Sequence, residues 1–71
     1  MADVRAEMAG VLQSFRVAVG DMVTPDQEVA IMESMKMEIP VLAPVGGRVT
    51  KLDGSPGDFV QEGDVLVVIE P

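Results

Sequence analysis

The side chain with the clearest chemical potential in this chain is a lysine between two methionines, in the run Met35-Lys36-Met37. The sequence contains no cysteine and no histidine. No arrangement of nucleophile, base and pocket is recognisable in it, so an independent enzyme is not indicated. A primary amine without such partners is better suited to being modified than to catalysis. We therefore interpret Lys36 as a residue on which another enzyme acts.

The two methionines beside Lys36 favour the same interpretation. Most lysines are solvated surface charges, and we interpret Lys51 in this way. Met35 and Met37 could instead be core residues, but residues beside the apex of a turn have little core to join. Two exposed, flexible and polarizable side chains are well suited to contact with another protein.

The residues that position Lys36 belong to an internal repeat. Residues 1–34, shifted by 37 positions, align with residues 38–71, and seven of the 34 pairs are identical, where ordinary residue usage would give about two. The identical pairs are Val4/Val41, Ala6/Ala43, Gly10/Gly47, Gly20/Gly57, Asp21/Asp58, Val23/Val60 and Glu33/Glu70. If two similar halves pack around a pseudo-two-fold axis, the junction with Lys36 lies at one end of the molecule and both termini lie at the other.

Each half of the repeat has the pattern of four short strands separated by glycine-containing turns. We expect strands at 4–8, 11–18, 22–24, 28–34, 37–43, 48–53, 58–60 and 65–70. No apolar segment keeps a helical period for long enough to predict a helix. A four-stranded unit with one apolar face cannot cover that face alone, but two copies can cover each other. The sequence therefore predicts an all-β fold, a flattened barrel-sandwich of two four-stranded antiparallel sheets, in one domain of residues 1–71.

The hairpin expected at the junction has unfavourable local chemistry. Its loop is two residues, Met35-Lys36, whereas two-residue loops prefer Asn-Gly or Asp-Gly because both positions need a positive φ. Glu33 falls opposite Glu38 in this register, which is mildly unfavourable for like charges. Such a departure from good local chemistry is typical of functional sites.

Composition excludes several classes of function. The net charge is −7, the five basic residues are scattered, and only two residues are aromatic, so nucleic-acid binding is not predicted. The longest aliphatic run, Val65–Ile69, is too short to span a membrane. Without histidine or cysteine, a zinc site is not expected. We expect a cytoplasmic protein, monomeric in isolation, whose acidity serves solubility or steering toward basic clefts.

The paired carboxylates of Gly20-Asp21 and Gly57-Asp58 have two interpretations. Two symmetric carboxylates could suggest acid–base chemistry. The repeat instead places them as equivalent tight turns in opposite halves, where glycine and aspartate are preferred residues. We therefore predict a structural role for both.

The segment Glu33–Glu38 resembles the attachment motif of biotinyl domains, whose core reads Ala/Ser-Met-Lys-Met. The resemblance covers essentially the whole chain, and the other segments that carry it are Met8–Val11, Val19–Val23, Ala43–Gly47 and Gly57–Asp64. The fold of this family is a flattened barrel of two four-stranded sheets, with the lysine on a hairpin opposite the termini. That arrangement agrees with the one that the repeat predicts.

The resemblance implies a biotin carboxyl carrier. A biotin protein ligase would attach biotin covalently to Lys36, and Glu33, Met35 and Met37 would help the ligase to select this lysine. The biotin would carry a carboxyl group from the biotin carboxylase to the carboxyltransferase of a biotin-dependent carboxylase. The domain itself would contribute no catalytic residue.

Three departures from the family pattern bear on the details, and the third of them leaves the parent carboxylase open. No proline lies next to Met8, Ser34 replaces the commoner alanine, and the segment Val17–Val29 is too short for the thumb loop of some acetyl-CoA carboxylase carriers. The chain most resembles short, free-standing biotin/lipoyl attachment proteins, and an excised domain of a longer carrier is an equal alternative.

Two alternatives remain. One is a lipoyl carrier of a 2-oxo acid dehydrogenase or glycine cleavage system, with lipoate as the alternative cofactor; its motif is usually Asp-Lys-Ala. The other is an unmodified interaction module, such as the hybrid domains of membrane-fusion adaptors. The Met-Lys-Met junction counts against both.

Overall fold

The computed structural model describes residues 1–71 and consists of eight strands joined by turns. The strands are β1 (Ala2–Arg5), β2 (Gly10–Phe15), β3 (Met22–Val23), β4 (Glu28–Ser34), β5 (Met37–Leu42), β6 (Gly47–Leu52), β7 (Phe59–Val60) and β8 (Val65–Glu70). They form two four-stranded antiparallel sheets. The terminal sheet has the order β1-β8-β6-β3, and the hairpin sheet has the order β5-β4-β2-β7. The predicted all-β fold of two four-stranded sheets is confirmed.

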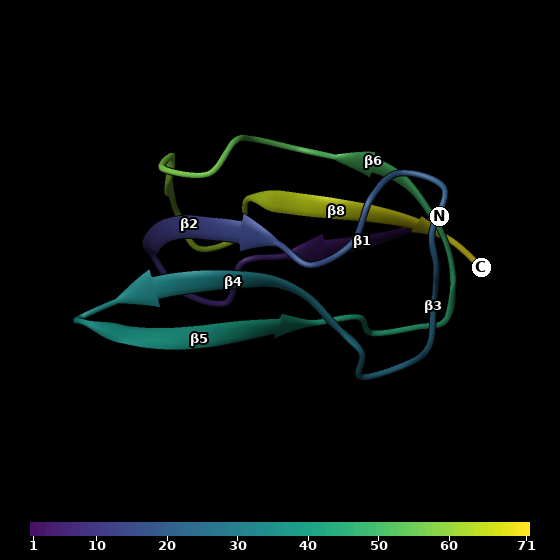
Figure 1. Ribbon diagram of the computed structural model, residues 1–71, viewed down its shortest axis with the longest axis horizontal. Coiled ribbons are helices and arrows are strands. Elements are labelled where there is room, and N and C mark those ends of the chain that lie inside the picture. Colours follow the sequence, from purple (N-terminus) through teal and green to yellow (C-terminus); the bar gives the residue numbers. More distant parts are fainter.

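The molecule is elongated, and different parts of the chain form its two ends. Its principal extents are 32 × 19 × 18 Å. Both termini lie at one end of the long axis, and the β4–β5 hairpin forms the other end (Figure 1). The predicted placement of the junction opposite the termini is therefore confirmed. No helix of the structure has the length and apolar character needed to cross a membrane.

The hydrophobic core between the sheets follows the repeat completely. Its fourteen buried apolar residues fall into seven pairs that are 37 positions apart in the sequence. They are Val4/Val41, Ala6/Ala43, Leu12/Val49, Val23/Val60, Val29/Leu66, Ala30/Val67 and Met32/Ile69. Each half thus supplies equivalent side chains to one shared core.

Backbone hydrogen bonds also link the two halves of the repeat in a reciprocal way. The Gly20 N–H donates to the Val49 carbonyl, and the equivalent Gly57 N–H donates to the Leu12 carbonyl, both at 2.8 Å. The return bonds run from the Val49 N–H to Asp21 and from the Leu12 N–H to Asp58, at 2.8 and 2.9 Å. A turn of each half is therefore completed by a strand of the other, so neither half satisfies its own backbone alone.

The two Gly-Asp turns have the structural role predicted for them. The Asp21 carboxylate accepts a hydrogen bond from the Ala18 N–H, and the Asp58 carboxylate accepts one from the Ser55 N–H, each at 2.9 Å. Each side chain thereby closes its own turn, as short polar side chains commonly do. The two turns lie in opposite halves of the repeat.

The largest differences from the predicted strand ends are in the first two strands, and the other strand ends differ by one residue at most. The first strand was expected at 4–8 but spans Ala2–Arg5, because the Ala6 N–H leaves the ladder and bonds to the Asp64 carbonyl at 2.8 Å. The second strand was expected at 11–18 but ends at Phe15. There the Ala18 N–H is held by the Asp21 carboxylate, which turns the chain.

Candidate modification site at the β4–β5 hairpin

Lys36 lies in the two-residue turn of a long hairpin. Strands β4 and β5 pair in antiparallel register, with Ser34 opposite Met37 at the last step before the turn. Met35 and Lys36 occupy the turn with φ values of 53° and 64°. Both are left-handed conformations that cost a residue other than glycine about 1–2 kcal/mol. The predicted two-residue loop and its need for positive φ are confirmed.

The turn presents its side chains to solvent. Met35 is 89% exposed and Met37 is 61% exposed; Lys36 is exposed too and takes part in no ion pair. Large apolar side chains in contact with water are unfavourable, so the turn is built for contact rather than for stability. The prediction that both methionines lie outside the core is confirmed.

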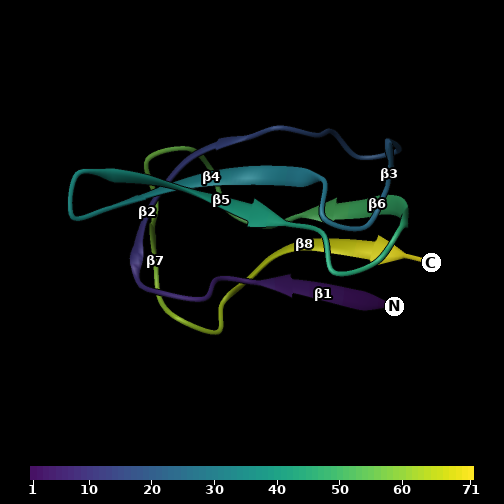
Figure 2. The ribbon, with the colours of Figure 1, turned by 90° about the horizontal axis from the view of Figure 1, so that it is seen from below.

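Lys51 has a different setting. It lies within strand β6, and its Nζ is 3.8 Å from the Asp53 carboxylate. An enzyme that acts on an unpaired lysine in a protruding turn can therefore distinguish Lys36 from Lys51 by shape alone. Figure 2 shows that the β4–β5 hairpin extends beyond β2 and β7, so the lysine stands clear of the body of the protein.

The hairpin has two sides near its tip: an inner side that is continuous with the core face of the sheet, where Met32 is buried, and an outer side that faces away from the core. Glu33 and Glu38 are exposed and directly opposite each other, which confirms the predicted register. Like charges in opposed positions are mildly destabilising. Glu33 accepts a long hydrogen bond of 3.5 Å from the Gln13 amide, and neither glutamate has a basic partner. Ser34 and Met37 lie on the inner side.

Strand β4 rests on Gly10 close to the tip of the hairpin, a contact that sequence reasoning missed. Gly10 falls between the expected strands 4–8 and 11–18, where a glycine-containing turn was predicted, but it is the first residue of β2 and is buried. A Cβ atom at Gly10 would lie 2.6 Å from the Glu33 carbonyl oxygen, closer than side chains can approach. Gly47, its partner in the repeat, meets Glu70 in the same way. The sequence signal for this contact was that Gly10/Gly47 and Glu33/Glu70 are both identical pairs of the repeat.

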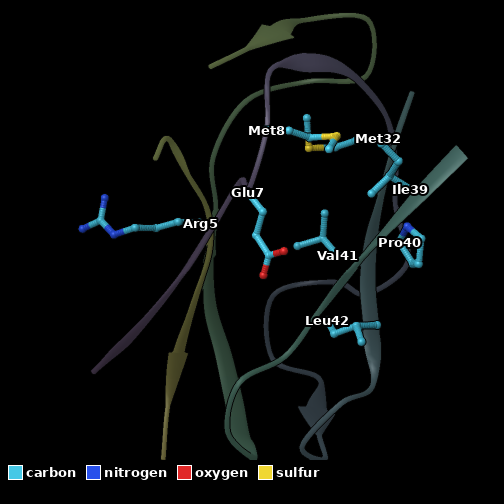
Figure 3. Close-up of a pocket in the computed structure, with 8 residues that line it drawn as sticks. All are labelled: Arg5, Glu7, Met8, Met32, Ile39, Pro40, Val41 and Leu42. Carbon is cyan, nitrogen blue, oxygen red and sulfur yellow. The ribbon is translucent and has the colours of Figure 1, made fainter. Parts of the chain in front are cut away.

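A shallow groove runs along β5 behind the tip. Its volume is about 170 Å³, and it separates the β1 side of the molecule from β5 (Figure 3). The Met8 and Met32 side chains lie together at one end of it, and the Arg5 side chain points away from it. Lys36 is not among the residues that line it. The lysine is therefore presented on a surface and is not enclosed.

The comparison with protein families assigns the chain to a family. A family model described as biotin-requiring enzyme, the biotin/lipoyl family, matches residues 2–69. The chain belongs to this family. Its members are carrier domains and not catalytic ones. The family resemblance predicted from the Glu33–Glu38 motif is thus confirmed.

Individual relatives are similar over most of their length. The chain is 52% identical over 64 residues to the biotin/lipoyl attachment protein of Bacillus subtilis (strain 168), covering 90% of this chain and 88% of that protein. It is 46% identical over 67 residues to the biotinylated protein TB7.3 homolog of Mycobacterium leprae (strain TN), covering 94% of each.

A solved structure of much larger size contains the same fold. The chain superposes on part of the Kluyveromyces lactis urea carboxylase with a TM-score of 0.93 and 36% identity. The match covers 97% of this chain and 6% of that one, so the chain corresponds to a small part of the carboxylase.

Proposed function

We propose that this member of the biotin/lipoyl family is a biotin carboxyl carrier with biotin joined through an amide to Nζ of Lys36. The observation that carries the proposal is the placement of Lys36 in a strained, protruding turn between two exposed methionines. The unpaired Nζ has no neighbour to displace, and its surroundings leave room for an acyl group. The relatives named for biotin attachment and biotinylation support the choice of group.

Each residue of the tip has a proposed role. Lys36 supplies the attachment atom, and its four-carbon stem keeps that atom away from the sheet. Met35 and Met37 present polarizable surface by which a biotin protein ligase selects this lysine. Glu33 supplies a negative charge on the outer side of the same hairpin. Bound biotin supplies a ureido nitrogen that can take up and release a carboxyl group.

The body of the domain acts as a rigid handle for that group. The termini and Lys36 lie at opposite ends of the long axis (Figure 1), so a linkage at either terminus leaves the tip free. A tethered group meets a partner site at about millimolar effective concentration. We propose a biotin carboxylase and a carboxyltransferase as the two partners, which makes the domain a carrier part of a biotin-dependent carboxylase.

A carboxyl-transfer assay tests the carrier role. The biotinylated protein is incubated with ATP, labelled bicarbonate and each biotin carboxylase of the source organism in turn. We expect label to become bound to the wild-type protein and not to the Lys36→Arg variant, which keeps the charge and the fold but cannot form the amide. A fully biotinylated wild type that takes up no label from any of these enzymes would contradict the carrier role.

A further inference from the structure

The outer face of the hairpin sheet carries a continuous row of side chains that begins beside Lys36. Phe59 of β7 pairs with Val11 of β2, Val11 pairs with Glu33 of β4, and Glu33 pairs with Glu38 of β5. Directly paired residues of antiparallel strands lie on the same face. All of them are exposed, with Phe59 at 66%. Four strands spaced by roughly 4.8 Å make this outer row about 14 Å wide.

The repeat supplies an internal comparison for the outer row. The equivalent row of the terminal sheet pairs Met22 with Arg48 and Arg48 with Glu70. Arg48 thus stands directly opposite a glutamate, whereas Val11 holds the equivalent place in the outer row. The core obeys the repeat in every pair, so this departure is not required for packing.

The two sheets also differ in the basic residues that their strands carry. The strands of the hairpin sheet contain no lysine or arginine, whereas the terminal sheet carries Arg5, Arg48 and Lys51. Glu33 and Glu38 are opposed and have no basic partner. A cation brought from outside would relieve their repulsion. Beside that pair lies an apolar pair, Val11 and Phe59, on the same face.

From this chemistry we infer that the outer row is a docking surface for the enzyme that modifies Lys36. Its partner surface would carry an arginine or lysine against Glu33 and Glu38, next to an apolar pocket that receives Phe59. This rests on the proposed attachment of biotin to Lys36 and extends recognition from the turn to the full width of the sheet.

The geometry favours the modifying enzyme over other occupants. Glu33 and Glu38 are two or three residues from Lys36, roughly 7–10 Å along an extended strand. An enzyme that forms a bond to Nζ must come within the length of the lysine side chain, so it lies against the row. Enzymes that use the attached group are held further away by the longer arm. A second copy that packed through the same row would bring two more glutamates and no basic side chain of that row against Glu33 and Glu38, which is unfavourable.

Steady-state kinetics with a purified biotin protein ligase, ATP and biotin test the inference. We expect Phe59→Ala to raise KM for the protein roughly tenfold with kcat unchanged, as for a well-placed aromatic contact. Met22→Ala is the matched control, because Met22 is equally exposed and occupies the equivalent place in the other sheet. It should leave KM unchanged. Thermal denaturation checks that both variants fold.

A second pair of variants tests the charges. Glu38→Gln should raise KM at low salt and reduce the dependence of KM on salt concentration, because one exposed attraction is lost. Glu70→Gln in the terminal sheet should change neither. Binding of the ligase to the unmodifiable Lys36→Arg protein, with and without Phe59→Ala, gives a readout that does not involve the reaction.

The outcomes separate the two proposals. Modification of Lys36 with the same KM for wild type, Phe59→Ala and Glu38→Gln would overturn the docking surface and leave the attachment site standing. A wild type that the ligase does not modify would overturn both. A concentration-dependent dimer that Phe59→Ala abolishes without changing KM would assign the row to a second copy and overturn the inference.

Discussion

At the scale of single residues, the tip of the hairpin contains conformations and contacts that lower stability but leave Lys36 accessible. Met35 and Lys36 hold left-handed conformations, and the two adjacent glutamates repel each other. The sequence predicted these features because the junction lies outside the repeat and contains no residue suited to its turn. It did not predict the left-handed Asp26, whose φ is 69°. The repeat aligns Asp26 with Gly63. The backbone shows that both residues have a positive φ, so aspartate here adopts the conformation that glycine adopts in the other half.

The conflict between stability and recognition at Met35 can be measured. Met35→Asn should raise the free energy of unfolding by about 0.5–1 kcal/mol, because asparagine is preferred at the first central position of such a turn. The same substitution should slow biotinylation of Lys36, because it removes an exposed apolar contact. Thermal denaturation and ligase kinetics report the two effects. A variant that is less stable, or that is modified at the wild-type rate, would show that Met35 has been misinterpreted.

At the scale of the elements, hydrogen bonds and close approaches decide what periodicity cannot. All the expected strands are present, because alternation and turn residues mark them in the sequence. Their ends depend on contacts between distant residues, such as the Ala6 N–H with the Asp64 carbonyl, and a local pattern does not contain these. Gly10 illustrates the same limit. Its role is to let β2 approach the carbonyl of Glu33, which a turn-based interpretation of glycine overlooks.

Two glycine variants separate close approach from backbone conformation. Gly10→Ala should destabilise the protein by about 1–3 kcal/mol, because its Cβ would press β4 away from β2. Gly20 has a φ of 98° and nothing within 4 Å of an added Cβ, so Gly20→Ala should cost only the backbone term of about 1–2 kcal/mol.

Amide hydrogen exchange distinguishes the two mechanisms. Gly10→Ala should increase exchange along β4 and the tip, whereas Gly20→Ala should act at its own turn and at its partner, Val49. Equal exchange at the hairpin in both variants would contradict the role given to Gly10.

At the scale of the whole molecule, symmetry and function occupy different places. The core and the turns follow the repeat, and the two halves complete each other's hydrogen bonds. Two departures from the repeat bear on the proposed function: the turn with Lys36, and the outer row with Val11 in the place of Arg48. The sequence was enough to predict the fold because each buried apolar position occurs twice, once in each half of the repeat. It predicted the pair Glu33 and Glu38 but not the rest of the outer row, because Val11 and Phe59 are distant in sequence and join that pair only when the strands are in register.

The measurement that tests the central claim most directly is the intact mass of the protein from cells with active biotin and lipoate ligases, followed by mapping of the modified residue. The account predicts a gain of one biotinyl group on Lys36, none on Lys51, and no gain in the Lys36→Arg variant. Biotin on Lys51, a lipoyl group in place of biotin, or an unmodified wild type would contradict it.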